Sequence, residues 1–182
     1  MEAKQIFRLK IAFIVLLSSK RETRKGLEMP DKDWRDSLRA CFENIEILER
    51  CIAETDENFR QFCEFIAEPA FEALAGELKI YGVKARFGVS RGKSTWIQCN
   101  FPKSRVDHFH YIISLPKNSV ELKLRLHIRG RKTARSPLTE EEKPFFEGLP
   151  PAKVMKISKE ELIHNIIAHY RDFALRALMS TD

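Results

Sequence analysis

The feature that most constrains the fold is an alternation of apolar and polar side chains over residues 120–129. Apolar residues occupy the even positions from Val120 to Ile128, and charged residues or histidine occupy the odd positions from Glu121 to Arg129. A two-residue repeat is typical of a β-strand with one face in the core and one face in solvent. We therefore predict a half-buried strand over 120–129.

Three upstream segments carry a similar repeat and predict three more strands, over residues 83–90, 95–101 and 108–115. Short turns rich in glycine, proline, serine and asparagine separate the first two of these strands and precede the fourth. Because short turns join antiparallel neighbours, the four segments predict a four-stranded antiparallel meander. One face of this sheet should pack on helices.

Before the strands, the spacing of apolar residues changes to steps of three and four, which is typical of an amphipathic helix. Asp31 or Asp33 can cap its first turn, so we expect the first helix over 33–54. The polar residues 55–58 predict a break after it. The apolar positions on this first helix are Leu38, Phe42, Ile45, Leu48 and Ile52.

Helical spacing resumes at Phe59 and continues to Gly82, a residue suited to a helix C-terminus. Pro69 should kink this second helical segment or start a new helix there, because proline lacks an amide hydrogen and clashes with the preceding turn.

Two capping boxes lie in the last third of the chain. Thr139 and Glu142 predict a single helical turn inside the proline-rich and charged segment 130–157. Ser158 and Glu161 open a long segment with a broad apolar face, which predicts a C-terminal helix. The expected fold class is therefore α+β, with N-terminal helices, the four-stranded meander and a C-terminal helix packed on the same sheet face.

Apolar residues make up 43% of the 182 residues, which is enough for one core. We expect a single domain over 31–182 and an N-terminal extension over 1–30, and Met29 is an alternative natural start. The apolar run at 11–17 is shorter than the roughly 20 residues that a membrane-spanning helix needs, and the basic residues after it disfavour a cleaved signal peptide. The four cysteines form no Cys-x-x-Cys pair, so reduced thiols and a cytoplasmic location are expected.

Charge is distributed unevenly along the chain. Residues 31–80 hold 6 basic and 13 acidic side chains, whereas residues 84–135 hold 13 basic and 2 acidic ones. Cations at the polar positions of the strands should gather on the sheet face opposite the core. The residues that we expect to bind an anion or nucleic acid there are Lys84, Arg86, Arg91, Lys93, Trp96, Lys123, Arg125, Arg129, Arg131 and Lys132.

This basic face has more than one interpretation. It can neutralise nucleic-acid phosphates or meet an acidic protein, including the acidic helices of a second copy. It can also be an ordinary solvated face whose Lys and Arg residues deter aggregation at the sheet edges. Trp96 points outward in the predicted strand, where a base could stack on it, unless the segment 130–157 covers it.

Two patterns that suggest chemistry are weak. Residues 88–94 resemble a phosphate-binding P-loop but lack its first glycine, since that position is Phe87, and they join two strands where a P-loop joins a strand to a helix. His108 and His110 share a strand face, and they could form a metal or acid–base site with His127 if the strand register allowed it. No cofactor is expected.

The sequence favours a small non-enzymatic binding protein of the cytoplasm whose basic sheet face docks an anionic macromolecule. Nucleic acid and acidic protein are the two candidate partners, and no membrane association is expected. One alternative is a protein-interaction or homodimerising module in which acidic helices meet a basic sheet. A second alternative is a histidine-dependent or metal-dependent enzyme.

Overall fold

The computed structural model describes residues 33–90, 93–100, 108–133 and 135–179. The chain divides into two units, Met1–Cys41 and Phe42–Asp182. In the first unit the described residues form the start of a helix, where the Asp33 carboxylate accepts a hydrogen bond from the Arg35 amide. The second unit contains the sheet and the hydrophobic core. The expected N-terminal extension and the alternative start at Met29 lie outside the described residues.

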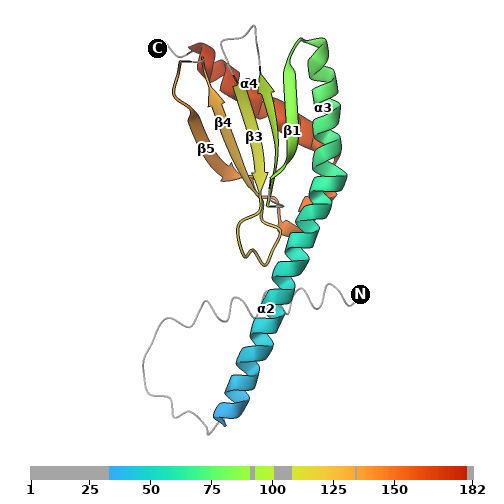
Figure 1. Cartoon of the computed structure of the whole chain (residues 1–182), viewed down its shortest axis with the longest axis vertical. Helices are drawn as coiled ribbons and strands as arrows, with labels where there is room; N and C mark the ends of the chain where they lie inside the picture. The colour runs from blue at the N-terminus through green and yellow to red at the C-terminus, as the bar shows by residue number, and fades with distance from the viewer. Residues whose placement is uncertain (1–32, 91–92, 101–107, 134, 180–182) are drawn as a thin grey trace. The chain divides into compact units, whose positions relative to one another are not determined.

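A five-stranded antiparallel sheet forms the centre of the second unit, with its strands in chain order (Figure 1). The strands are β1 (Lys84–Ser90), β2 (Ser94–Asn100), β3 (His108–Ser114), β4 (Arg125–Arg131) and β5 (Thr139–Pro144). The predicted α+β class with an antiparallel meander is confirmed. The predicted number of four strands is wrong.

The strand missed by the prediction is β5, where a single helical turn was expected. β5 pairs with β4, with Glu140 opposite Arg129. Ion pairs hold it on both faces, since Glu140 binds Arg129 and Glu141 binds Arg176 of the C-terminal helix. An edge strand held by charges lacks the apolar alternation that reveals a buried strand.

β4 starts at Arg125, five residues later than the alternation predicted. The preceding strand β3 ends at Ser114, which pairs with Arg125, so residues 120–124 extend past the end of their neighbour. Leu122 and Leu124 are nevertheless buried, and the Leu124 carbonyl accepts a hydrogen bond from the Phe145 amide. The alternation over residues 120–124 therefore arises because Leu122 and Leu124 are buried, although this segment does not pair with β3.

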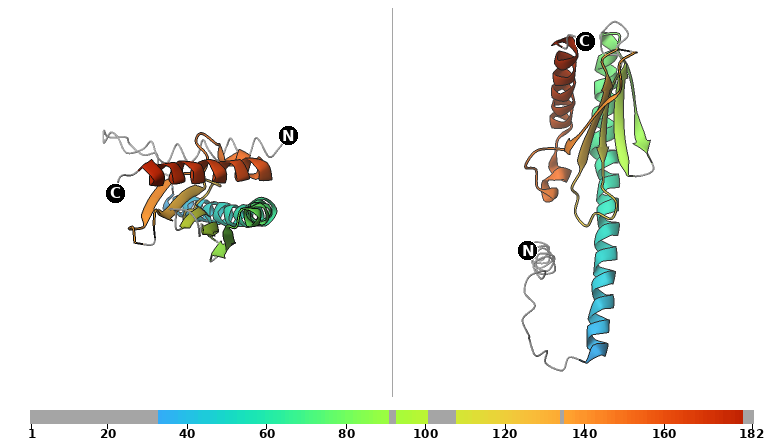
Figure 2. Two further views of the ribbon diagram at one scale, coloured as in Figure 1. Left: turned by 90° about the horizontal axis from the view of Figure 1, so that it is seen from above. Right: turned by 90° about the vertical axis from the view of Figure 1, so that its left-hand side faces the viewer.

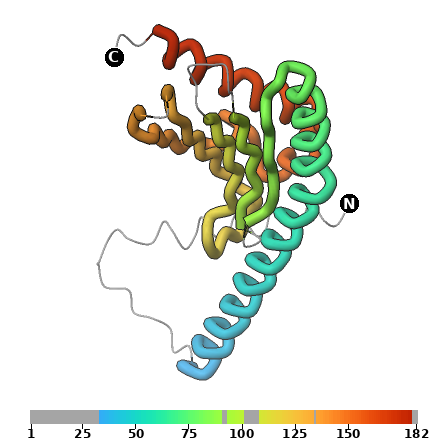
Figure 3. The backbone as a smooth tube through the Cα atoms, turned by 45° about the horizontal axis from the view of Figure 1, so that its top comes forward, coloured from blue at the N-terminus to red at the C-terminus, as the bar shows by residue number. Residues whose placement is uncertain are grey.

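The N-terminal helices follow one another without a break, as α2 (Trp34–Phe62), the π-turn η1 (Cys63–Ala67) and α3 (Glu68–Ile80) (Figure 3). The predicted break at 55–58 is wrong. Thr55 is buried, and its hydroxyl donates a hydrogen bond of 2.8 Å to the Cys51 carbonyl one turn back. This bond satisfies the hydroxyl inside the helix, so a polar residue there does not end it.

Pro69 occupies the first turn of α3, in agreement with the prediction that a helix restarts there. The Glu68 amide just before it donates to the Cys63 carbonyl, five residues back. Because proline cannot donate an amide hydrogen bond, a locally widened turn next to it is a common way to relieve the clash.

Helices α3 and α4 (Lys159–Met179) pack on the same face of the sheet (Figure 2). Phe71 of α3 contacts Phe87 of β1, while Phe109 of β3 contacts Tyr170 and Phe173 of α4. The expected position of the C-terminal helix is confirmed.

The predicted cap of α4 is also confirmed. The Ser158 amide donates to the Glu161 carboxylate at 2.7 Å, and the Glu161 amide donates to the Ser158 hydroxyl at 3.1 Å. These reciprocal bonds satisfy two amides that a helix start otherwise leaves without a partner.

Candidate functional site

The side chains that point away from α3 and α4 form what we call the outer face of the sheet. The strand register arranges them in rows that cross the sheet. Two rows near one end are Lys84–Asn100–His108–Arg131 and Arg86–Gln98–His110–Arg129–Glu140. The next two are Gly88–Trp96–Ile112–His127–Glu142 and Ser90–Ser94–Ser114–Arg125.

Six of the ten residues predicted to bind an anion belong to these rows: Lys84, Arg86, Trp96, Arg125, Arg129 and Arg131. Arg91 lies outside the described residues. The pattern of alternating side chains could predict this gathering because alternation determines which residues of each strand share a face: the even-numbered residues of β1 to β3 and the odd-numbered residues of β4.

Three of the predicted residues lie next to the sheet, outside the strand rows. Lys93 is in the turn before β2, and its ammonium contacts both carboxylate oxygens of Asp56 on α2, at 2.8 and 2.9 Å. Lys123 precedes β4 and binds Glu121 at 2.8 Å. Lys132 follows β4 and lines a small cavity beside β5.

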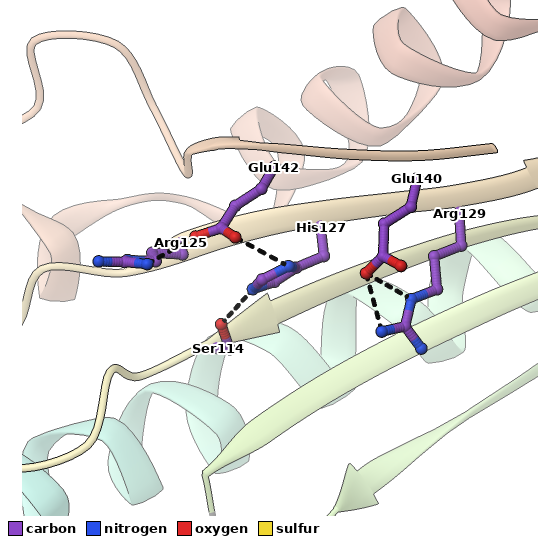
Figure 4. Close-up of polar contacts among 6 residues, drawn as sticks. All are labelled: Ser114, Arg125, His127, Arg129, Glu140 and Glu142. Atoms are coloured by element: carbon purple, nitrogen blue, oxygen red, sulfur yellow. Dashed lines mark hydrogen bonds and ion pairs between the residues drawn. The ribbon is translucent and has the colours of Figure 1, made fainter.

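On the half of the outer face made by β4 and β5, carboxylates neutralise two of the three arginines. Arg125 binds Glu142 at 2.6 Å, and Arg129 binds Glu140 at 2.8 Å (Figure 4). Both carboxylates come from β5, which the sequence pattern did not reveal. The predicted basic face therefore loses much of its positive charge at this side.

The other half, made by β1, β2 and β3, holds no aspartate or glutamate in any of its strands. Lys84 and Arg86 are exposed there and, among the described residues, form no ion pair. Their cross-strand neighbours Asn100 and Gln98 are neutral. We call this part of the outer face, over β1 to β3, the cationic half.

Trp96 lies in the cationic half, and its indole ring contacts β1 at Gly88 and Ser90. It pairs with Gly88, and a Cβ atom added to Gly88 would lie 3.5 Å from the Cζ2 atom of the ring. The indole Nε1 donates to the Ser90 hydroxyl at 3.0 Å, and the His110 ring meets it edge-on at 5.3 Å. These contacts fix the orientation of a half-exposed aromatic ring.

His110 is held in its neutral form. Burial first, and then the positive charges of Arg129 and His108, lower its pKa to about 4. Its Nε2 atom is buried and has no hydrogen-bond partner among the described residues. His110 therefore supports the Trp96 ring through aromatic contact and adds no charge at neutral pH.

The register does not assemble the three histidines. His108 and His110 lie opposite Arg131 and Arg129, and His127 lies opposite Ile112. In the part of the chain that the structure describes, no three His, Cys, Asp or Glu side chains gather in a way that could hold a metal ion.

His127 takes part in a different arrangement, with Ser114 and Glu142 (Figure 4). The Ser114 hydroxyl lies 2.9 Å from His127 Nε2, and His127 Nδ1 lies 3.9 Å from Glu142. The order serine–histidine–carboxylate is that of a hydrolase nucleophile. The sequence did not predict this arrangement, since Ser114 did not stand out and Glu142 was assigned to a helix cap. The two residues belong to different strands, and only the register brings them to His127.

The surroundings of Ser114 do not favour nucleophilic catalysis. Acyl transfer needs amide donors aimed at the developing oxyanion, and Ser114 lies on a strand flanked by β2 and β4, whose ladders use the backbone amides. Glu142 is also engaged by Arg125 at a shorter distance than by His127. We interpret the three residues as a cross-strand polar cluster, with a hydrogen bond between Ser114 and His127 and a longer charge contact to Glu142.

Among the described residues, no helix combines the length and the apolar character that crossing a bilayer requires. Comparison with protein families, with curated proteins and with solved structures gave no match to this chain.

Proposed function

We propose that this protein binds single-stranded nucleic acid on the cationic half of the outer face, without catalysing a reaction. The observation that supports this proposal is the placement of Lys84, Arg86 and Trp96 on one open sheet surface that carries no carboxylate. Surfaces that bind single strands combine two components: cations that contact the phosphates and aromatic side chains on which the bases stack.

The electrostatic part of the proposal rests on Lys84 and Arg86. Both are exposed at the edge strand β1, and no acidic strand residue lies between them and β4. Each phosphate contact of a single strand releases counterions, so the affinity should fall with salt, with a logarithmic slope of roughly −0.7 per contact.

The stacking part rests on Trp96. Contacts with Gly88, Ser90 and His110 fix the orientation of the indole before a base binds. Stacking therefore costs little further side-chain conformational entropy. Stacking of this kind contributes roughly 1–3 kcal/mol per base and tolerates any sequence. Gln98 and Asn100 follow Trp96 on β2, opposite Arg86 and Lys84. The Gln98 amide donates to Asn100 Oδ1 at 3.2 Å, and the remaining amide hydrogens of the two side chains can donate to base edges.

An acidic protein is the other partner that the cations could bind, and stacking on Trp96 separates the two possibilities. Binding of an acidic peptide would weaken on the loss of Lys84 and Arg86, but such a peptide has no base to stack on the indole.

We propose a cytoplasmic location. Burial raises the pKa of the Cys63 and Cys99 thiols to about 12, and such inert, reduced thiols suit a protein of the reducing cytoplasm.

The test is fluorescence anisotropy of a labelled single-stranded RNA or DNA oligonucleotide, titrated with the full chain at several salt concentrations. The double variant Lys84→Glu/Arg86→Glu should weaken binding at least tenfold and lower the salt slope by about 1.4. Trp96→Ala should weaken binding by roughly 5- to 150-fold and leave the salt slope unchanged.

A matched control carries the same change in net charge elsewhere. Lys153→Glu/Arg171→Glu replaces two exposed cations on η2 (Pro151–Lys156) and α4, away from the outer face. Equal weakening by both double variants would show a general charge effect and refute the proposed site. Tight binding of polyglutamate that Trp96→Ala leaves unchanged, together with weak oligonucleotide binding, would favour the acidic-protein partner instead.

A further inference from the structure

The apolar stripe of α2 is longer than the part that its own sheet and helices bury. Its residues recur at alternating steps of three and four, the repeat of a coiled coil. They are Trp34, Leu38, Cys41, Ile45, Leu48, Ile52, Thr55, Phe59 and Phe62. The last three are buried in the core, whereas the first five are exposed and Ile52 is half-buried. We call Trp34 to Ile52 of this series the exposed seam.

The exposed seam is unusually apolar for a helix surface in water. Leu38 is 49% exposed, Ile45 44% and Leu48 41%, and Phe42 beside the seam is 64% exposed. In proteins, most of the stability of a helix comes from packing of its apolar face rather than from helix propensity. An exposed apolar surface of this kind marks an interaction site, and its spacing suits a partner with the same helical repeat.

We propose that this partner is the exposed seam of a second copy of the chain, paired in the antiparallel direction. In the alignment that matches the exposed seam with itself from end to end, Leu38 packs against Leu48 of the other copy. Trp34 packs against Ile52 and Cys41 against Ile45 in the same way. Each layer thus joins residues of the two apolar positions of the repeat, as an antiparallel coiled coil requires.

The charges beside the seam fit the same alignment. Arg35 and Glu49 occupy equivalent flanking positions, two repeats apart, and the antiparallel alignment sets each Arg35 beside the Glu49 of the other copy. Glu49 is exposed and forms no ion pair with any described residue. A parallel alignment would set Glu49 beside Asn44 and would gain no ion pair, so charge complementarity favours the antiparallel pair.

The flanking aromatic residue supports the alignment too. Phe42 lies one position after Cys41, on the same side of the seam as Arg35 and Glu49. In the antiparallel pair, the two Phe42 rings meet across the two-fold axis, which removes the most exposed part of the stripe between Leu38 and Ile52 from water. A symmetric pair of this kind uses one surface twice and closes on itself.

This dimer uses α2 and leaves the outer face of the sheet free, so it does not depend on the proposed nucleic-acid site. It also differs from a dimer that joins acidic helices to a basic sheet. A pairing of opposite charges would dissociate as salt rises, whereas apolar packing along the seam persists in high salt.

The test is sedimentation equilibrium of the full chain over a range of concentrations in 0.5 M salt, with far-ultraviolet circular dichroism to verify folding. We expect a mass of about twice 21.2 kDa. Leu48→Glu should raise the dimer dissociation constant at least tenfold. Ile47→Glu, the matched control, replaces a neighbouring residue of similar exposure that lies off the seam, and it should leave the dimer intact.

A charge exchange tests the alignment. Arg35→Glu should weaken the dimer, and the double variant Arg35→Glu/Glu49→Arg should recover most of the loss because the ion pair is restored in reverse. A chain that stays monomeric at every concentration, or equal effects of Leu48→Glu and Ile47→Glu, would overturn the proposal. Failure of the double variant to recover would overturn the antiparallel alignment.

Discussion

Replacing Gly130 with alanine tests whether α4 packs on the sheet face opposite the outer face. Gly130 is buried on β4, and an added Cβ atom would lie 2.2, 2.6 and 2.8 Å from three ring carbons of Phe173. Ordinary contacts between such atoms are 3.4–4 Å, so the ring would have to move by more than 1 Å. Phe173 cannot move freely, because it is buried against Phe109.

Overpacking in a core typically costs about 1–3 kcal/mol, and the closeness of three atoms places this substitution near 3 kcal/mol. In a chain of this size, that loss lowers the melting temperature by roughly 6–12 °C. Thermal and urea unfolding monitored by circular dichroism measure it. Combining Gly130→Ala with Phe173→Leu should cost less than the sum of the two single changes, since the smaller side chain removes the clash.

Gly88→Ala provides the matched control on the opposite face. The added methyl group would lie 3.5 Å from Trp96, an ordinary contact, so the free energy of unfolding should change by less than about 0.5 kcal/mol. If Gly130→Ala were as mild as Gly88→Ala, α4 would not pack on β4 as described. The assignment of the outer face would then fail with it.

Three further predictions concern single contacts. Ser158→Ala should lower the free energy of unfolding by about 1 kcal/mol, because it removes the side-chain cap of α4; urea denaturation measures this, and an unchanged midpoint would contradict the cap. The pKa of His110 is about 4 in the folded chain, below its ordinary value of 6.5. Between these two pH values the unfolded chain binds more protons than the folded one, so the free energy of unfolding falls as the pH falls from 6.5 to about 4. Solvent screening reduces this loss to roughly 1–2 kcal/mol, and His110→Gln should remove it; parallel pH profiles of wild type and variant would contradict the burial of His110. Asp56→Asn should cost less than about 1 kcal/mol, because the ion pair with Lys93 is partly exposed; a larger loss in the same assay would show that this contact holds the β1–β2 turn in place.

The fold could be predicted where burial alternates along a strand or follows one helix face. The three strands predicted within residues 83–115 were found from this alternation, and the cap at Ser158 was found from the capping-box motif. Both signals depend only on neighbours in the sequence. β5 could not be found, because Thr139–Pro144 is held by ion pairs to Arg129 and Arg176 from other elements. A strand stabilised by distant charges has no local signature.

The candidate site was predicted in part for the same reason. Lys84, Arg86 and Trp96 fall on one face because strand parity determines where they point. The neutralisation of Arg125 by Glu142 was missed, since it depends on a strand that the pattern did not reveal. The placement of His127 beside Ser114 depends on register, which spacing within one strand does not determine.

The π-turn η1 determines how the side chains of α2 are rotated about the helix axis relative to those of α3. A wide turn holds one residue more than an α-helical turn, and each residue of an α-helix rotates the chain by about 100°. Deleting Glu64 would therefore swing the side chains upstream of Cys63 around the helix axis by roughly that angle, without altering any of their identities. The five residues of η1 thus set the direction of the apolar side of α2 relative to α3, so a single insertion or deletion there would rotate that whole side, whereas a substitution on α2 changes one position of it.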